Sequence, residues 1–443
     1  MQAKQPTVCI QTLGCKVNQY ESTAIAERFS AEGFSVVQAG EVADICVVNT
    51  CTVTAESDRK ARQMIRRMMT QNPNAYILVT GCYAQVAPQE VAKIKGVDYV
   101  SGNAEKLAVV NAAKALVARG KKNDIPEIAA DSPDSKGFEP MCIHHFDRTR
   151  AYVKIEDGCE SHCTYCIIPS ARGKIRSKAP VDVLHEVEAL TRGGCREIVL
   201  TGIETASYGR DLDGWDLARL LGEINQIEGV GRIRLGSLDP SLMKQSFVDA
   251  LAGLTCLAPH FHLSMQSGSD RVLAHMKRKY NTRIALEGME RLRKAMPGVQ
   301  FTTDMIVGFP GETDEDFEQT RAFIQKARFL MIHVFPYSRR QGTPADAMPD
   351  QVSEEIKHKR AAILAADAAE IRKEILASAI GTEQTVLFET LESGRIKGHT
   401  ENFFEVSCPT NSDLRGELAR VFIETADDKL CYGNIIFKTE RRS

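Results

Sequence analysis

The sequence predicts an α/β protein with an N-terminal parallel α/β domain, a partial (β/α)6 barrel and a small C-terminal all-β module. Residues 1–119 and residues 141–380 each alternate short apolar runs with helical patterns, which is typical of parallel sheets with helical crossovers. Residues 381–443 hold only short runs of alternating apolar and polar residues, and these predict the β module.

The N-terminal domain is predicted from strands at 8–12, 45–49 and 75–80 with helices at 22–32 and 58–69. Strands that alternate with helices in this way favour a parallel sheet. Residues 120–140 follow and are polar and rich in Pro, Gly and Ser, without a sustained apolar period. We expect them to form a linker.

The barrel is predicted from six β-type runs with helical patterns between them. The runs are AYVKI, EIVL, RIRL, FHL, FTTDMIV and HVF. Short connections between six βα units favour an incomplete barrel over an open sheet. A long helix is expected over residues 353–379, with Ser353 as its cap, and Gly381 ends it.

Composition narrows the class of protein. With 443 residues, 43% hydrophobic and 26% charged, the chain resembles an ordinary globular protein. The net charge of -2 excludes a globally basic nucleic-acid binder, so any such partner must meet local patches of Lys and Arg. No secretion signal or membrane span is evident, and we expect a cytoplasmic protein. The odd count of 13 cysteines then favours metal or redox use over disulfides.

Three cysteines are spaced C-x3-C-x2-C directly after the first barrel strand. They are Cys159, Cys163 and Cys166, in a loop that begins with a glycine. Three thiolates can hold three irons of a [4Fe-4S] cluster and leave the fourth open to a ligand with nitrogen and oxygen donors. The alternative is a zinc site, but its fourth ligand would have to be His162, inside the loop itself.

This loop resembles the signature of the radical S-adenosylmethionine (SAM) superfamily, in which an aromatic residue, here Tyr165, precedes the last cysteine. The resemblance implies a partial (β/α)6 barrel in which SAM chelates the open iron. It also implies that an electron from the cluster cleaves SAM to a 5'-deoxyadenosyl radical. The protein's part is to position and shield these groups, and Tyr165 is expected to shield the cluster.

Three further cysteines lie just beyond predicted strands of the N-terminal domain. Cys15, Cys51 and Cys82 follow the runs VCIQT, ICVVNT and YILVT. Because the carboxyl ends of parallel strands converge at one edge of a sheet, these cysteines are well placed to share a second cluster. Cys9 and Cys46 lie within strands and are expected in the core.

With two cysteine sets and a C-terminal β module, the chain resembles the methylthiotransferases, which join this N-terminal domain to a radical SAM barrel and a TRAM module. The resemblance covers nearly the whole chain. It implies two [4Fe-4S] clusters and SAM as cofactors. It further implies that the auxiliary cluster carries sulfur that one SAM methylates, while a second SAM yields the radical that abstracts hydrogen.

Two strings narrow the resemblance within that family. TLGCKVNQYES at residues 12–22 and NTCTVTAESDRKAR at 49–62 are similar to the MtaB type, which modifies C2 of N6-threonylcarbamoyladenosine at position 37 of tRNA. The implied partners are a tRNA anticodon stem-loop and an electron donor such as flavodoxin or ferredoxin. The alternatives are methylthiolation of isopentenyladenosine or of the ribosomal protein S12 aspartate, and a non-catalytic iron-sulfur protein that binds RNA.

Local basic clusters favour an RNA substrate independently. Our candidates for RNA contacts are Arg59, Lys60, Arg62, Arg66, Arg67, Arg172, Lys174 and Arg278. The C-terminal module, in contrast, carries more acidic than basic residues. Within it, Phe403 and Phe404 with Arg395 and Lys397 form either a stacking surface for an unpaired loop or part of a plain β core.

SAM contacts are expected at two predicted strand ends. GFPGET follows FTTDMIV, and the resemblance places Val307, Gly308, Pro310 and Gly311 near the adenosine of SAM. The resemblance also implies that Glu204, after another strand, binds the SAM amine. The sequence departs from the MtaB pattern here, because Glu204 and Ala206 replace His and Gly, and SMQSG at 264–268 replaces Pro-Leu-Gln-Ser-Gly. No catalytic residue is expected beyond the cluster ligands.

Overall fold

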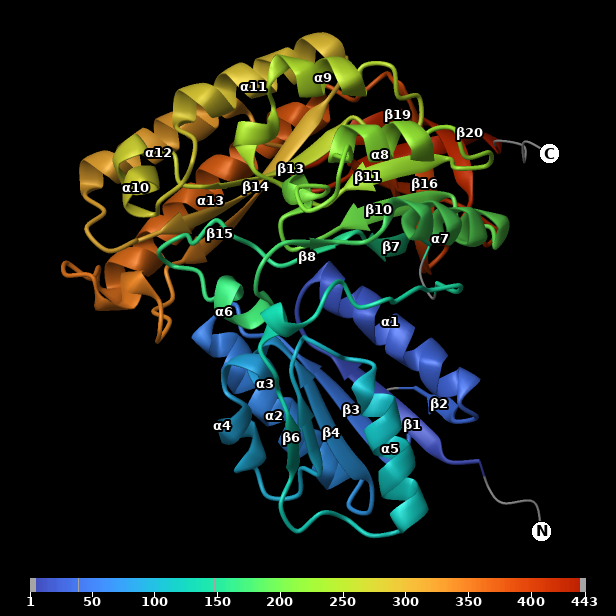
Figure 1. Ribbon diagram of the computed structural model, residues 1–443. Helices are drawn as coiled ribbons and strands as arrows, with labels where there is room; N and C mark the ends of the chain where they lie inside the picture. Colours follow the sequence, from blue (N-terminus) through green and yellow to red (C-terminus); the bar gives the residue numbers. More distant parts are fainter. Residues whose placement is uncertain (1–4, 39, 147–148, 439–443) are drawn as a thin grey trace. The chain divides into compact units, whose positions relative to one another are not determined.

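The computed structural model describes residues 5–38, 40–146 and 149–438, and the chain forms two compact units (Figure 1). Unit 1 comprises Met1–His145, Lys154–Asp182 and Ser338–Asp346, and unit 2 comprises Phe146–Val153, Val183–Tyr337 and Ala347–Ser443. Unit 1 therefore takes in the cysteine loop around residue 160, which the sequence analysis assigned to the barrel. Both cysteine triads belong to unit 1.

Unit 1 is built on a six-stranded parallel sheet in the order β2-β1-β3-β4-β5-β6. The strands are β1 (Thr7–Thr12), β2 (Ser35–Val37), β3 (Ile45–Thr50), β4 (Tyr76–Gly81), β5 (Tyr99–Ser101) and β6 (Glu127–Ala129). The helices are α1 (Lys16–Ala31), α2 (Ala55–Gln71), α3 (Cys82–Val86), α4 (Pro88–Ala92) and α5 (Ala108–Arg119). The predicted parallel α/β fold of this region is confirmed.

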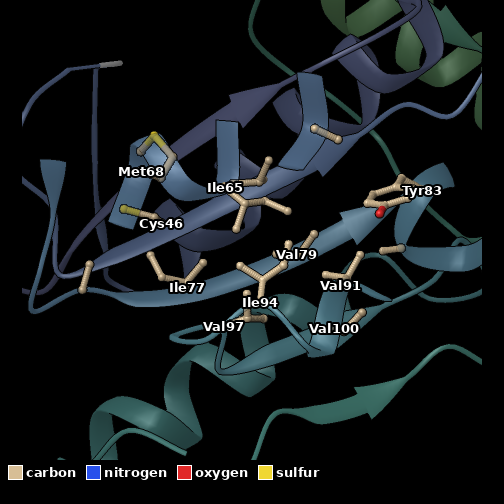
Figure 2. Close-up of a cluster of buried hydrophobic side chains, with 14 of the residues drawn as sticks. Cys46, Ile65, Met68, Ile77, Val79, Tyr83, Val91, Ile94, Val97 and Val100 are labelled. Atoms are coloured by element: carbon tan, nitrogen blue, oxygen red, sulfur yellow. The ribbon is translucent and has the colours of Figure 1, made fainter. Parts of the chain in front are cut away.

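Helices cover both faces of this sheet. On one face, α1 and α5 bury Ile25, Phe29 and Val110 against the strands, and on the other α2 to α4 bury Ile65 and Val91 (Figures 1 and 2). Figure 2 shows Cys46 inside the second cluster of apolar side chains. Cys9 and Cys46 are both completely buried, as expected for core cysteines.

The predicted linker contains structure. Within 120–140, Glu127–Ala129 forms the edge strand β6 beside β5, and Pro133–Ser135 forms a 3-10 turn. The side chains of β6 are exposed, so the strand has no buried face to leave an apolar alternation in the sequence. A second short sheet in unit 1 pairs β8 (Glu156–Asp157) with β9 (Arg176–Ser177), and α6 (Ile168–Arg172) lies between them in the chain.

Unit 2 holds the predicted barrel strands in two sheets, ordered β11-β10-β7 and β12-β13-β14-β15. The strands are β7 (Ala151–Lys154), β10 (Glu197–Thr201), β11 (Arg232–Leu235), β12 (Ser237–Leu238), β13 (His260–Gln266), β14 (Gln300–Val307) and β15 (Met331–Pro336). The helices are α7 (Pro180–Arg192), α8 (Leu217–Ile224), α9 (Gln245–Leu251), α10 (Asp270–His275), α11 (Thr282–Ala295) and α12 (Asp314–Ala327). All predicted barrel strands are present.

The long helix is confirmed as α13 (Glu354–Ala377), and the side chain of Ser353 caps its first turn. It packs on β15 and α12. Among the helices of the described ranges, none is both long enough and apolar enough to span a membrane.

The C-terminal module is a closed five-stranded barrel in the order β16-β17-β18-β20-β19. Its strands are β16 (Glu383–Glu392), β17 (Arg395–Thr400), β18 (Glu405–Pro409), β19 (Leu418–Ala426) and β20 (Cys431–Lys438). Strand β17 shows little apolar alternation in the sequence, because its inward positions are Ile396, Gly398 and Thr400, of which only one is strongly apolar. Residues 439–443 of the predicted module lie outside the described residues.

The two phenylalanines of the module differ in environment. Phe404 is buried and belongs to the core, while the Phe403 ring stacks between His260 of β13 and His399 of β17, with centroids 4.3 and 4.6 Å away. Arg395 donates hydrogen bonds to Ser407. Phe403 therefore contacts β13 and Phe404 is buried, so these two rings do not form a free stacking surface.

Candidate metal centres

Cys15, Cys51 and Cys82 lie at the carboxyl ends of three strands, of which β1 and β4 both pair with β3. Cys51 directly follows β3, Cys82 directly follows β4, and Cys15 occupies the N-cap position of α1, three residues after the end of β1. Adjacent strands are about 4.8 Å apart, so this arrangement brings the three loops together at one edge. The sequence prediction of their placement is confirmed.

Two observations show how tightly these loops approach. Gly14 has φ +109°, and a Cβ on it would lie 2.8 Å from the Cβ and 3.0 Å from the Sγ of Cys51. Only glycine allows the chain before Cys15 to pass so close to Cys51. Burial raises the pKa of the Cys51 thiol, and the charges of the nearby Cys82 and Cys15 thiolates act in the same direction.

Cys159, Cys163 and Cys166 lie in the loop between β8 and α6. The Cys159 amide donates to the Gly173 carbonyl (3.0 Å) and the Cys166 amide to the Cys163 carbonyl (3.0 Å), which closes the loop on itself. Gly158, with φ +94°, is the residue just before Cys159. This position requires a glycine, because a Cβ there would lie 1.9 Å from the Lys174 carbonyl oxygen.

Backbone amides face two of these sulfur atoms. The Ser161 amide donates to the Sγ of Cys159 and the Ile168 amide to the Sγ of Cys166, both over 3.4 Å. Such N–H groups stabilise thiolate charge on cluster ligands. Tyr165 is half-buried in the same loop and His162 is exposed.

The cysteines of both triads are free thiols and are therefore available as metal ligands. No disulfide occurs among the described cysteines. Within the same ranges, no group of three His, Cys, Asp or Glu side chains is arranged to hold one metal ion. In a cluster, each of the three thiolates binds a different iron, so the sulfur atoms are spread more widely.

A buried network of charges lies beside Cys82, and sequence reasoning missed it. Its carboxylates are Glu21 and Asp157, and its cations are Lys106, Lys154, Arg172 and Arg176. Burial opposes the charge on Glu21, but Arg172, Lys106 and Lys154 outweigh it and hold the pKa of that carboxyl well below its usual range. The one available signal was Glu21 at helical spacing from Val17 and Ile25, on the buried face of α1.

A second missed contact reaches the loop that follows Cys51. Arg340, in the segment 338–346, is buried and donates to both Asp58 and Thr52. The Thr52 hydroxyl in turn donates to Asp58 over 2.6 Å. The loop after Cys51 is thereby tied to a segment that lies far away in the chain.

The expected RNA contacts have different environments. Arg59, Lys60, Arg66 and Arg67 are exposed on α2, and Arg62 is half-buried and donates to the Tyr83 hydroxyl. Lys174 is exposed as well.

Two of the expected RNA contacts are engaged inside the protein. Arg172 is completely buried in the charge network, so its guanidinium is not available to a phosphate at the surface. Arg278 in unit 2 is paired with Asp239 over 3.0 Å. The expectation for Arg172 is therefore corrected: a basic residue in a basic stretch is here the counter-charge of buried carboxylates.

The expected SAM contacts other than Tyr165 lie in unit 2. Val307 ends β14 and is buried, as are Gly308 and Pro310, and the Gly308 amide donates to Glu312 over 2.9 Å. Pro310 and Gly311 line a pocket together with Arg271, His275, Glu312 and Asp350. Glu204 is partly exposed on the loop after β10. Packing also requires a glycine at position 308, since a Cβ there would lie 2.3 Å from the Cγ of Lys357.

Two parts of the chain match known protein families. Residues 153–324 match the radical SAM superfamily, and residues 7–102 match the uncharacterized protein family UPF0004. A solved structure of the radical SAM methyltransferase TsrM from Kitasatospora setae is similar in fold, with a TM-score of 0.58, 16% identity and 77% of each chain covered.

Curated relatives match over nearly the full length. The threonylcarbamoyladenosine tRNA methylthiotransferase MtaB of Bacillus subtilis is 40% identical over 94% of this chain and 93% of its own. The MtaB of Thermotoga maritima is 40% identical over 90% of each chain. The tRNA-2-methylthio-N(6)-dimethylallyladenosine synthase of Desulfitobacterium hafniense is 33% identical over 95% of each. The chain is an enzyme, uses a [4Fe-4S] cluster with SAM, and belongs to the radical SAM methylthiotransferase family.

Proposed function

We propose that this enzyme inserts a methylthio group at C2 of N6-threonylcarbamoyladenosine at position 37 of tRNA. The observation that carries the proposal is the presence of two cysteine triads in one compact unit, since insertion of sulfur needs a sulfur carrier as well as a radical generator. Similarity to proteins named threonylcarbamoyladenosine tRNA methylthiotransferase over 94% of the chain supports the choice of substrate.

A second [4Fe-4S] cluster is part of the proposal, held by Cys15, Cys51 and Cys82. When bound, the cluster at Cys159, Cys163 and Cys166 with SAM supplies radical chemistry, and the second supplies the sulfur. The protein holds the irons through its thiolates, stabilises thiolate charge through the amides of Ser161 and Ile168, and keeps Cys51 and Cys82 away from water.

The tRNA is proposed to meet the exposed basic side chains of α2, in particular Lys60, Arg66 and Arg67, together with Lys174. Arg59 is also exposed, but it forms an ion pair with Glu56. Phosphate contacts of this kind position an RNA without reading its sequence. A small one-electron donor of the flavodoxin or ferredoxin class is the proposed reductant. At the SAM site we propose contacts from Glu204, from Tyr165 and from the loop Val307 to Gly311.

One assay tests the substrate. The protein is reconstituted anaerobically with iron and sulfide and incubated with SAM, reductant and one of three substrates: tRNA with threonylcarbamoyladenosine, tRNA with isopentenyladenosine, or ribosomal protein S12. Mass spectrometry then measures the methylthio product. We expect product on the first substrate alone. Product only on S12 would show that the enzyme modifies a protein instead of tRNA. Absence of SAM cleavage would contradict every radical mechanism.

Isopentenyladenosine is the second candidate, because a relative named as a dimethylallyladenosine synthase is 33% identical over 95% of this chain. The two nucleosides differ in charge at N6: the threonylcarbamoyl group carries a carboxylate and the isopentenyl group is apolar. A preference for the isopentenyl substrate in the same assay would select this alternative.

A further inference from the structure

Arg172 stands out because it adjoins both cysteine triads. It is the last residue of α6, the short helix that begins two residues after Cys166, and α6 packs on α3, which begins at Cys82. The side chain is completely buried, and its Nε lies 3.2 Å from the Sγ of Cys82. The same residue thus follows one triad in sequence and contacts the other in space.

The rest of the guanidinium is held in a way that directs Nε at the sulfur. Nη1 donates to Glu21 over 2.5 Å and lies 3.3 Å from Asp157, while Nη2 donates to the Oδ1 of Asn18 over 2.7 Å. A guanidinium is planar and its donors have fixed directions. With both terminal nitrogens anchored, the Nε–H bond has one remaining direction, and Cys82 occupies it.

Asn18 extends this arrangement to the other two cysteine loops. Its amide nitrogen donates to the Leu13 carbonyl (2.7 Å), two residues before Cys15, and to the Thr50 carbonyl (3.0 Å), next to Cys51. Both donor positions are therefore used, and the Asn18 oxygen faces Arg172. Through Cys82 directly and through Asn18, the guanidinium is connected to all three auxiliary ligand loops.

We infer that Arg172 is a positioning residue for the auxiliary cluster, whose Nε–H donates a hydrogen bond to the Cys82 thiolate and raises the reduction potential of that cluster. The inference rests on the proposed second cluster. An N–H donor stabilises negative charge on a ligand sulfur, and this favours the reduced cluster, which carries more negative charge. A charge-assisted donor is stronger than a backbone amide.

Arg176 is the matched comparison. It is buried in the same network, lies 3.4 Å from Asp157, and donates to the Arg172 carbonyl over 2.8 Å. Its guanidinium also donates to the Pro133 carbonyl, so its hydrogen bonds and its ion pair are made to oxygen atoms, whereas Arg172 donates to a sulfur. Removing Arg176 therefore takes the same charge from the network but leaves the hydrogen bond to Cys82.

The test uses the full chain with Cys159, Cys163 and Cys166 replaced by Ala, so that only the auxiliary cluster remains. Its midpoint potential is measured by redox titration with electron paramagnetic resonance in this parent and in Arg172→Gln, Arg172→Lys and Arg176→Gln. For Arg172→Gln we expect at least a tenfold lower ratio of reduced to oxidised cluster at the parent's midpoint, which is about 59 mV for one electron. Arg176→Gln should change the ratio by less than about threefold.

Arg172→Lys keeps the charge and lacks the fixed Nε donor, so it separates hydrogen bonding from charge. We expect a shift in the same direction as for Arg172→Gln. Equal shifts for Arg172→Gln and Arg176→Gln would overturn the inference and leave only a general charge effect, as would an unchanged potential in Arg172→Lys.

Measuring the iron content of each variant keeps the test decisive if a variant fails to assemble the auxiliary cluster. Loss of iron from both Arg172 variants with retention in Arg176→Gln supports a specific positioning role, and loss from all three overturns it. If the parent itself binds no iron while its circular dichroism is that of the wild type, the proposed second cluster fails rather than the role of Arg172.

Discussion

Arg340 forms a buried ion pair with Asp58, 282 residues earlier in the chain. Both side chains belong to unit 1, and Arg340 also donates to Thr52, the residue after Cys51. A segment from the end of the barrel series thus holds the loop of an expected cluster ligand.

Replacing Arg340 by Met should destabilise the protein by about 3–5 kcal/mol, because Asp58 would stay buried without its partner. It should also lower the iron bound at Cys15, Cys51 and Cys82. Arg339→Met is the control, since Arg339 is exposed, and its cost should stay within about 0.5 kcal/mol. Urea denaturation and iron analysis measure both effects, and similar costs for the two variants would contradict the structural role of Arg340.

The two triads should be separable by mutation. Cys51→Ala is expected to lower the iron content by about half and to abolish methylthio transfer, while SAM cleavage continues at the other triad. Cys159→Ala should abolish SAM cleavage. Cys46→Ala provides the control, because Cys46 is a core residue completely buried on β3: it should cost about 1 kcal/mol of stability and leave the iron content unchanged. Loss of SAM cleavage in Cys51→Ala would show that the triads do not act separately.

Charge reversal on α2 should weaken tRNA binding. For Arg66→Glu with Arg67→Glu, we expect the slope of log Kd against log salt concentration to fall by about 0.7–0.9 for each phosphate that the variant no longer neutralises. Arg119→Glu on α5, which covers the opposite face of the sheet, should leave that slope unchanged. Binding titrations over a range of salt concentrations measure it. Equal effects of the two reversals would indicate a general charge effect instead of a binding surface on α2.

Acid should destabilise unit 2 through Glu197. Burial opposes the charge on this side chain, but Arg234, Arg150 and Arg232 outweigh it and hold the pKa of its carboxyl far below the usual value of 4.5. A carboxyl whose pKa is lower in the folded state stabilises the fold above its unfolded pKa, and this contribution is lost as the pH falls.

The urea midpoint of the wild type should therefore fall as the pH drops below about 5. Glu197→Gln should be less stable at pH 7 by about 3–5 kcal/mol, since Arg234 loses its carboxylate partner while Arg150 and Arg232 keep only Glu389 and Glu401. The stability of the variant should also depend less on pH over this range. Parallel pH profiles for the variant and the wild type would exclude Glu197 as the origin of the acid sensitivity.

Local patterns were enough to predict most elements. The apolar runs before Cys15, Cys51 and Cys82 form β1, β3 and β4 as expected, and α13 starts after Ser353. The exceptions are two strands whose inward and outward positions differ little in hydrophobicity: β6 has exposed side chains, and β17 has a glycine and a threonine at inward positions. Alternation predicts a strand only where one face is buried and apolar.

The sequence by itself determined the candidate cluster ligands, because the spacing of Cys159, Cys163 and Cys166 and the position of the other three after strands follow from local order. Only the tertiary structure decided the role of the charges around them. Arg172 and Arg340 look like any surface arginine in the sequence, and their partners Glu21 and Asp58 lie 151 and 282 residues away. Whether a charge is solvated or buried depends on what folds over it, and no local pattern carries that information.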